Sequence, residues 1–109
     1  MASEANRTRK NRESLSKRLG RVARQIKARD NGRCIYCWHT AEESGTHLQL
    51  DHLLPRVDGG ADVAENLVVA CRDCNGTRKN MSLDAWCTKI GVSAAKIRRQ
   101  ALLPLPAEA

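Results

Sequence analysis

Four of the five cysteines form two Cys-x-x-Cys pairs, Cys34 with Cys37 and Cys71 with Cys74, with 33 residues between the pairs. Thiolates two residues apart fit a tight turn, and two such pairs can close a tetrahedral shell of soft ligands around one ion. The spacing therefore predicts a structural zinc site with no open position for chemistry. The alternative, four buried free cysteines, leaves the paired spacing unexplained. Cys87 stands beside a tryptophan and is expected to be a small buried apolar residue.

The segment between the cysteine pairs contains the neighbours Asp51 and His52, whose side chains suit the hydrolysis of a phosphodiester. A carboxylate is a hard ligand for Mg²⁺ or Mn²⁺, and an imidazole can act as a general base near neutral pH. Neighbours in a regular strand point to opposite faces, so both can serve one site only where the strand distorts or ends. Pro55 favours such an end. In isolation, the pair would be interpreted as a turn aspartate and a surface histidine.

The order of the surrounding motifs resembles that of the HNH endonuclease family. The motifs D-H-L-L-P, G-G, E-N-L and C-x-x-C-N follow one another between about Arg29 and Leu83, half of the chain, in the order and spacing of that family. Each motif alone is weak, but the set is specific. The resemblance implies an α+β fold, a small zinc-stapled ββα-metal core (His-Me finger, treble-clef-like) with flanking helices.

The resemblance also implies roles for single residues. His52 stands at the first histidine of the motif and would be the general base, while Asp51 would bind a catalytic divalent ion. Asn66 stands at the middle asparagine and would fasten the loop between the two strands. Asn75 stands where many members have the last histidine, and its carbonyl oxygen would be the second ligand of the ion. This departure favours Mg²⁺ or Mn²⁺ over a softer metal, because an amide oxygen replaces an imidazole.

By the mechanism of the family, DNA would be cleaved to leave 5′-phosphate and 3′-hydroxyl ends. Arg56 and Arg78 are the nearest candidates for substrate phosphate contacts, although both could be ordinary surface charges. Glu65 could support the site, but a position facing solvent is the simpler interpretation. A zinc module that binds DNA or a protein without cutting is the alternative function, and only the expected catalytic trio argues against it.

The elements that must position these residues follow from periodicity and turn signals. Apolar residues at helical spacing predict a helix over residues 13–30, in which Gly20 costs about 1 kcal/mol relative to alanine. Residues 38–46 indicate no element. The further expected elements are short strands at 47–54 and 66–70, a helix at 71–80, a helix capped by Ser82 and ended by Gly91, and a last helix capped by Ser93 that runs to Leu102.

The net charge of +7 is concentrated at the N-terminal end, since residues 1–33 carry +8 and residues 34–109 carry −1. Such asymmetry favours DNA, double-stranded in the simplest case, over a membrane surface, because the basic end lacks the Trp and Phe of interfacial helices. The expected organisation is a disordered basic tail at 1–12, the HNH nuclease domain at 13–103 with its core at about 29–83, and a loose tail at 104–109.

No apolar run approaches the roughly 20 residues of a membrane helix, and the polar, Arg-rich start predicts no signal peptide. The cysteines are therefore expected in a reducing cytoplasm, that of a bacterial or phage-infected host cell. The resemblance fits a phage packaging or restriction partner. A monomer and a homodimer both remain open, as do nicking and double-strand cleavage.

Overall fold

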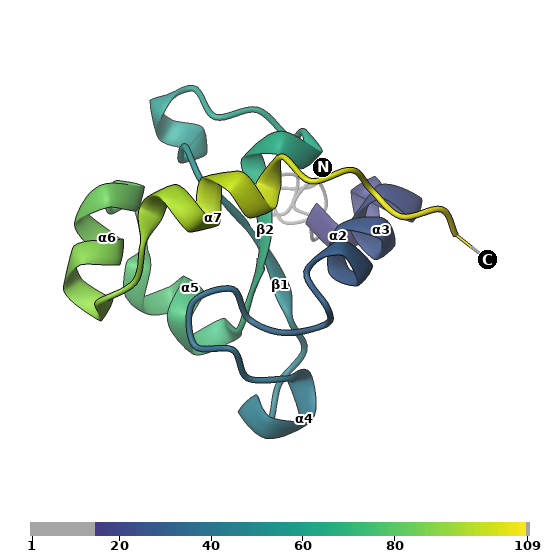
Figure 1. Cartoon of the computed structure of the whole chain (residues 1–109), viewed down its shortest axis with the longest axis horizontal. Helices are drawn as coiled ribbons and strands as arrows, with labels where there is room; N and C mark the ends of the chain where they lie inside the picture. Colours follow the sequence, from purple (N-terminus) through teal and green to yellow (C-terminus); the bar gives the residue numbers. More distant parts are fainter. Residues whose placement is uncertain (1–14, 109) are drawn as a thin grey trace, which may run out of the picture.

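A two-stranded antiparallel ribbon lies at the centre of the computed structural model, with helices around it (Figure 1). The structure describes residues 15–108, so the expected basic tail at 1–12 lies outside the described residues. β1 (Gln49–His52) and β2 (Leu67–Ala70) fall inside the ranges expected for strands, and their register pairs His52 with Leu67. The expected α+β class is confirmed.

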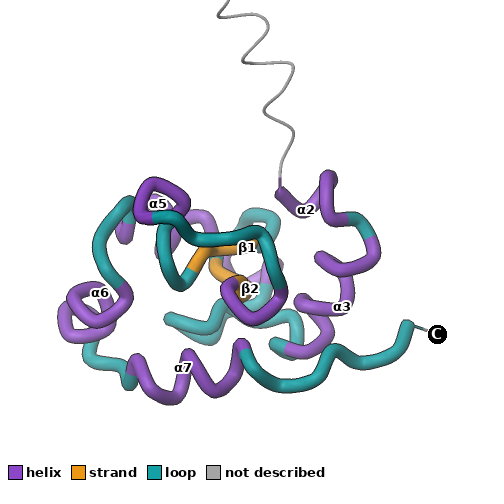
Figure 2. The backbone as a smooth tube through the Cα atoms, turned by 90° about the horizontal axis from the view of Figure 1, so that it is seen from above, coloured by secondary structure: helices purple, strands orange, loops and turns teal. Residues whose placement is uncertain are grey.

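The helices flank this ribbon on different sides. Figure 2 shows α2 and α3 on one side and α5 and α6 on the other, while α7 packs against β2 and α6. No helix among residues 15–108 is long and apolar enough to cross a membrane. The helices are α2 (Leu15–Leu19), α3 (Arg21–Arg29), α4 (Ala41–Ser44), α5 (Arg72–Arg78), α6 (Leu83–Ile90) and α7 (Ala94–Ala101), and short 3₁₀ turns lie at η1 (Arg56–Asp58) and η2 (Ala64–Asn66).

The single helix expected over residues 13–30 is wrong, because the chain forms two helices with a break at Gly20. This glycine has a φ of 51°, in the left-handed region that side chains with a Cβ rarely adopt. The break lets α2 contact β1 while α3 packs against β2. Gly20 is therefore a hinge between two helices, and not a residue that lowers the stability of a single helix.

Residues 38–46 also differ from the expectation, since they contain the short helix α4. Thr40 caps it: the Thr40 hydroxyl accepts from the Glu43 amide, and the Glu43 carboxylate accepts from the Thr40 amide. This T-x-x-E capping box is a sequence signal that could have predicted the helix. The two caps that were expected, Ser82 for α6 and Ser93 for α7, are confirmed by hydrogen bonds from backbone amides to their hydroxyls.

The core is divided into two clusters by β2, which is buried on both faces. Val68 and Ala70 belong to one cluster, with Trp86 of α6 and apolar residues of α7. Leu67 and Val69 belong to the other cluster, with apolar residues of α3. Alternate residues of a strand point to opposite faces, which explains this division and the uninterrupted apolar run of β2. The ribbon is thereby held between two packed layers, and the end of β1 is fixed relative to α5.

Candidate active site and metal centre

Four cysteine sulfurs come together where the segment after α3 meets the start of α5. The Sγ atoms of Cys34, Cys37, Cys71 and Cys74 all lie within 4.8 Å of one another, and those of Cys37 and Cys71 are 3.7 Å apart. Neighbouring sulfurs in a tetrahedral site are about 3.8 Å apart when the metal–sulfur bonds are about 2.3 Å long. The four thiols are therefore positioned to bind a metal ion, and this donor set fits zinc.

Each pair is organised by a backbone amide that donates to its first sulfur, from Cys37 to Cys34 at 3.5 Å and from Cys74 to Cys71 at 3.4 Å. Burial raises the pKa of the Cys37 thiol to about 11 and also raises the pKa of Cys74. Burial acts in the same direction on Cys71, but hydrogen bonds led by that from the Cys74 amide outweigh it and lower the pKa of Cys71. Ionisation of all four thiols at this distance requires a cation among them.

Helix α5 carries half of the cysteine cluster and one wall of a neighbouring cavity. Cys71 is its N-cap, Cys74 lies in its first turn, and Asn75 follows directly. The same helix contacts β1. Because Cys74 and Asn75 are consecutive on a short helix, an ion held by the cysteines would also fix the position of Asn75.

A cavity of about 220 Å³ lies between the end of β1, the loop that follows β1, and α5. Asp51, His52 and Asn75 all line it, together with Arg56. β1 ends at His52, which allows two neighbouring residues of a strand to face one space. The other residues that line the cavity are Leu50, Pro55, Val57, Lys79 and Asn80.

Asp51 is buried, and its two carboxylate oxygens have different surroundings. Oδ2 accepts hydrogen bonds from the Tyr36 hydroxyl at 2.5 Å and from Arg78 Nη1 at 2.7 Å. Burial, with the Asp51 carboxylate adding to it, raises the pKa of Tyr36 far above its usual range, so the phenol stays protonated and donates. Oδ1 accepts no hydrogen bond from residues 15–108. One oxygen therefore fixes the carboxylate, and the other is available to a ligand.

Arg78 differs from the expectation that it contacts a substrate phosphate. Its side chain is 0% exposed and does not line the cavity. Burial alone would lower the pKa of Arg78, but the Asp51 carboxylate outweighs this and raises it. The guanidinium faces inward because the fork of donors on arginine matches several acceptors at once. Its remaining partners are the Tyr36 hydroxyl and the backbone carbonyls of His52, Leu53 and Met81.

His52 is half-buried, and its ring has one hydrogen-bond partner among residues 15–108. Its Nε2 lies 2.7 Å from Oδ1 of Asp62, a residue in the loop between the strands. Asp62 is also within reach of two arginines, since Arg18 Nη2 lies 3.2 Å from its Oδ2 and Arg56 Nε lies 3.9 Å from its Oδ1. The pKa of Asp62 is lowered, chiefly by the hydrogen bond from His52 and further by these arginines.

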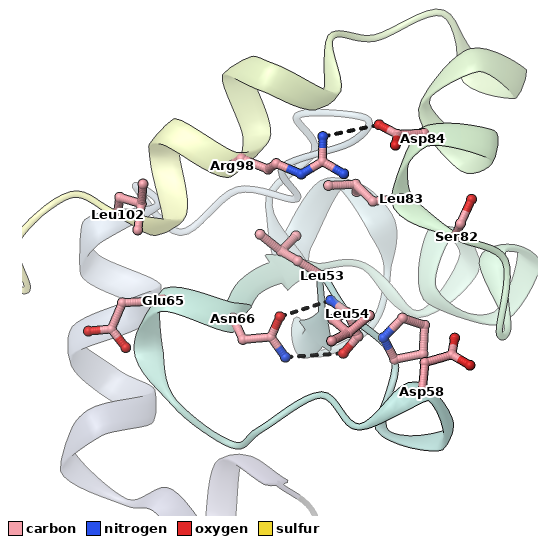
Figure 3. A pocket seen from close by; sticks show the side chains of 11 residues that line it. Leu53, Leu54, Asp58, Glu65, Asn66, Ser82, Leu83, Asp84, Arg98 and Leu102 are labelled. Carbon is pink, nitrogen blue, oxygen red and sulfur yellow. Dashed lines mark hydrogen bonds and ion pairs between the residues drawn. The ribbon is translucent and has the colours of Figure 1, made fainter.

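Asn66 ties the loop between the strands to the end of β1 (Figure 3). Its Oδ1 accepts from the Leu54 amide at 2.8 Å, and its Nδ2 donates to the Leu54 carbonyl at 3.1 Å. The same Nδ2 also donates to the Ala61 carbonyl at 3.0 Å. A Cβ added at Gly60 would lie 1.7 Å from the Leu54 carbonyl oxygen and 2.9 Å from Asn66 Nδ2. Only glycine fits this close approach, so the Gly-Gly turn and Asn66 shape the loop together.

The remaining predicted site residues lie in three different settings. Asn75 donates from Nδ2 to Gln49 Oε1 at 2.9 Å, and its Oδ1 accepts no hydrogen bond from residues 15–108. Arg56 has a side chain that is 61% exposed at the cavity rim. Glu65 is exposed and lines a separate cavity of about 380 Å³, which does not include Asp51 or His52 (Figure 3).

Three residues of this region were missed by sequence reasoning. Asp62 follows the Gly-Gly turn, but an acidic residue in a polar loop carries no signal of a partner across the loop. Lys79 directly follows α5 and lines the cavity. Tyr36 could have been found, because the only tyrosine of the chain lies inside a Cys-x-x-Cys pair and a buried tyrosine hydroxyl needs a partner.

Comparison with known proteins agrees with the motifs. Residues 34–81 match the family model described as HNH endonuclease, which confirms the resemblance. Over 71 residues, 64% of this chain, the sequence is 28% identical to the CRISPR-associated endonuclease Cas9 of Corynebacterium diphtheriae. Over 61 residues, 54% of this chain, it is 36% identical to the protein of the same name from Actinomyces naeslundii. These stretches make up only 6% and 5% of the two relatives.

Proposed function

We propose that this chain hydrolyses phosphodiester bonds of double-stranded DNA with the help of a divalent metal ion, because residues 34–81 match the HNH endonuclease family model. The observation that carries the proposal is the single cavity lined by Asp51, His52 and Asn75. A module that only binds zinc and DNA has no need for this trio. The endonuclease names of the two similar proteins also support hydrolysis.

His52 is proposed as the general base. Its Nε2 is engaged by Asp62, whereas Nδ1 has no hydrogen-bond partner among residues 15–108 and can accept a proton from an attacking water. In-line attack of this water on phosphorus would leave 5′-phosphate and 3′-hydroxyl ends. Arg56, at the rim of the cavity, is proposed to contact the substrate phosphate.

Asp51 and Asn75 are proposed to hold the divalent ion, each through an oxygen that no described residue occupies. A carboxylate and an amide oxygen form a hard donor pair, which fits Mg²⁺ or Mn²⁺. Such an ion would neutralise the charge that develops on the phosphate and the leaving 3′-oxygen. Asn66 keeps the loop opposite these ligands closed.

The four cysteines are proposed to hold zinc as a structural ion. Their four sulfurs would fill a tetrahedral shell and would leave no position for water, so this ion would support the fold without taking part in hydrolysis. Its contribution to catalysis is indirect, because it would hold Cys74 and thereby the neighbouring Asn75.

Cleavage of a supercoiled plasmid tests the proposal. We expect nicking by the full chain with Mg²⁺ or Mn²⁺, none with a chelator, and a rate lower by about 10²- to 10⁴-fold for His52→Ala, since general-base catalysis contributes that much. His39→Ala is the matched control, because His39 is exposed and does not line the cavity. Equal activity of His52→Ala and the wild type would contradict the mechanism. Plasmid binding without cleavage under either metal would favour the binding module.

A further inference from the structure

The loop between the two strands places a second carboxylate behind His52. Oδ1 of Asp62 lies 2.7 Å from His52 Nε2, a distance expected for a charge-assisted hydrogen bond. Asp62 lies ten residues after His52 in the chain, and a turn precedes it in which the Gly60 amide donates to the Pro55 carbonyl at 3.0 Å. The motif that identifies His52 does not include Asp62.

We propose that Asp62 is a positioning residue that holds the His52 ring in one orientation and one tautomer, so that Nδ1 is the nitrogen that takes the proton. The inference rests on the proposed function and assigns a role that the family motif leaves open. An ionised carboxylate can only accept hydrogen bonds, so Nε2 must carry the hydrogen in this contact. In the neutral ring, Nδ1 then holds the lone pair.

The surroundings of Asp62 favour its ionised form. Arg18 on α2 approaches Oδ2 at 3.2 Å, and Arg56 approaches Oδ1 at 3.9 Å. His52 and these two arginines each contact the Asp62 carboxylate directly. The contact with Arg18 also anchors the carboxylate from a helix outside the loop. Asp62 is thus restrained on one oxygen while the other oxygen orients the imidazole.

A carboxylate at this position acts at two stages of the reaction. Before proton transfer, it prevents the ring from turning or from holding the proton on Nδ1, where the base would be blocked. After proton transfer, it faces the imidazolium and stabilises the positive charge. Substitution of an aspartate in an equivalent arrangement behind a catalytic histidine can cost about 10⁴-fold in rate, because the ring adopts the wrong tautomer.

Spectroscopy of the ring tests the inference without any cleavage. Long-range ¹H–¹⁵N spectra of the histidines, recorded near pH 8.5 where imidazoles are ordinarily neutral, report which nitrogen carries the hydrogen. We expect the Nε2-protonated form of His52 in the wild-type chain and a mixed or reversed population in Asp62→Asn. Asp58→Asn is the matched control, because it removes the same charge from the same loop at an exposed site without a contact to His52. A wild-type ring protonated on Nδ1 would overturn the inference.

Single-turnover cleavage gives the second readout. Asp62→Asn should lower the rate at saturating DNA by about 10²- to 10⁴-fold and change the half-saturating DNA concentration by less than about threefold. Asp62→Glu should recover part of the rate, since a carboxylate returns, and Asp58→Asn should cleave like the wild type. A wild-type cleavage rate in Asp62→Asn would contradict the inference. A variant that only binds DNA more weakly, with an unchanged rate at saturating DNA, would also contradict it. If the wild-type chain cleaves no DNA, the proposed function fails, while the ring spectra still decide the role of Asp62.

Discussion

Two buried arginine–aspartate pairs stand at opposite ends of the loop between the strands. Arg29 pairs with Asp30 at the end of α3, and Arg78 pairs with Asp51 across α5 and β1. Each arginine also donates to backbone carbonyls of the loop or its ends, Arg29 to Ala64 and Leu67 and Arg78 to His52 and Leu53. Both pairs therefore fix the loop that carries Asp62 and Asn66.

The pairs differ in how completely the carboxylate is satisfied. Asp30 accepts four hydrogen bonds, with Arg29 and Gln100 on Oδ1 and with Arg29 and the Val69 amide on Oδ2. From residues 15–108, Asp51 accepts hydrogen bonds on Oδ2 alone. A buried carboxylate that accepts hydrogen bonds on both oxygens stabilises the fold. A carboxylate that is fixed through one oxygen at the wall of a cavity can still bind a ligand through the other oxygen. Burial and pairing are common to both aspartates and do not show which one has a functional role. The carboxylate oxygen of Asp51 that accepts no hydrogen bond from residues 15–108 distinguishes the two.

The largest expected effects come from replacing each aspartate by asparagine. In Asp51→Asn, the amide oxygen can keep both bonds on the Oδ2 side and turn its NH₂ toward the cavity. In Asp30→Asn, the NH₂ must face a donor. We expect Asp30→Asn to lower the free energy of unfolding by about 3–5 kcal/mol, and Asp51→Asn by about 1–2 kcal/mol. Cleavage by folded Asp30→Asn should stay within a few-fold of the wild type, while Asp51→Asn should lose about 10³-fold or more.

Denaturant titrations and single-turnover cleavage, both on the full chain, measure these effects. The proposed difference between the two pairs is contradicted if Asp51→Asn loses as much stability as Asp30→Asn, or if Asp51→Asn still cleaves DNA. Either result would mean that the open oxygen of Asp51 has no special role.

The sequence predicted the parts of this arrangement that are encoded locally. The cysteine pairs, the two strands and the serine caps each depend on a few neighbouring residues, and the structure contains them, although β1 is shorter at both ends than the range expected for it. The motif order also led to Asp51, His52 and Asn75, which line one cavity. The inward position of Arg78 could not be predicted, because a basic residue on a short polar helix has the same pattern whether it faces solvent or core.

The contact between His52 and Asp62 could not be predicted from the sequence for a related reason. It depends on how the loop closes, and loop closure depends on Asn66, Gly60 and the two buried arginines acting together. None of these residues belongs to a periodic pattern of the sequence that would predict the closed loop. The break at Gly20 likewise depends on packing, since the two helices contact different strands.

Removal of one neutral donor from each pair should give a smaller and more selective difference. Tyr36→Phe deletes the hydroxyl that donates to Asp51, and Gln100→Met deletes the amide that donates to Asp30. Both should lower the free energy of unfolding by about 1–3 kcal/mol, because hydrogen bonds to charged groups contribute that much. Only Tyr36→Phe should also raise the Mg²⁺ or Mn²⁺ concentration for half-maximal cleavage, by about 10- to 100-fold, since it loosens a proposed ligand.

A metal titration of cleavage for both variants distinguishes these outcomes. Equal metal requirements in Tyr36→Phe and the wild type would show that Arg78 alone suffices to hold Asp51. An increased requirement in Gln100→Met would show that the Arg29 pair also reaches the cavity, and the two pairs would then no longer be separable.

The smallest effect is expected at a third arginine–aspartate pair, which has similar geometry but lies on the surface. Arg98 Nη1 is 3.0 Å from Asp84 Oδ1, yet the side chains are 51% and 74% exposed (Figure 3). Solvent screens this attraction, so Arg98→Gln should change the free energy of unfolding by at most about 1 kcal/mol and by less at high salt. Cleavage should be unchanged, because neither residue lines the cavity of Asp51 and His52. Denaturation at low and high salt measures the difference. A loss comparable to that of Asp30→Asn would mean that pairing geometry, and not burial, sets the energies of all three pairs.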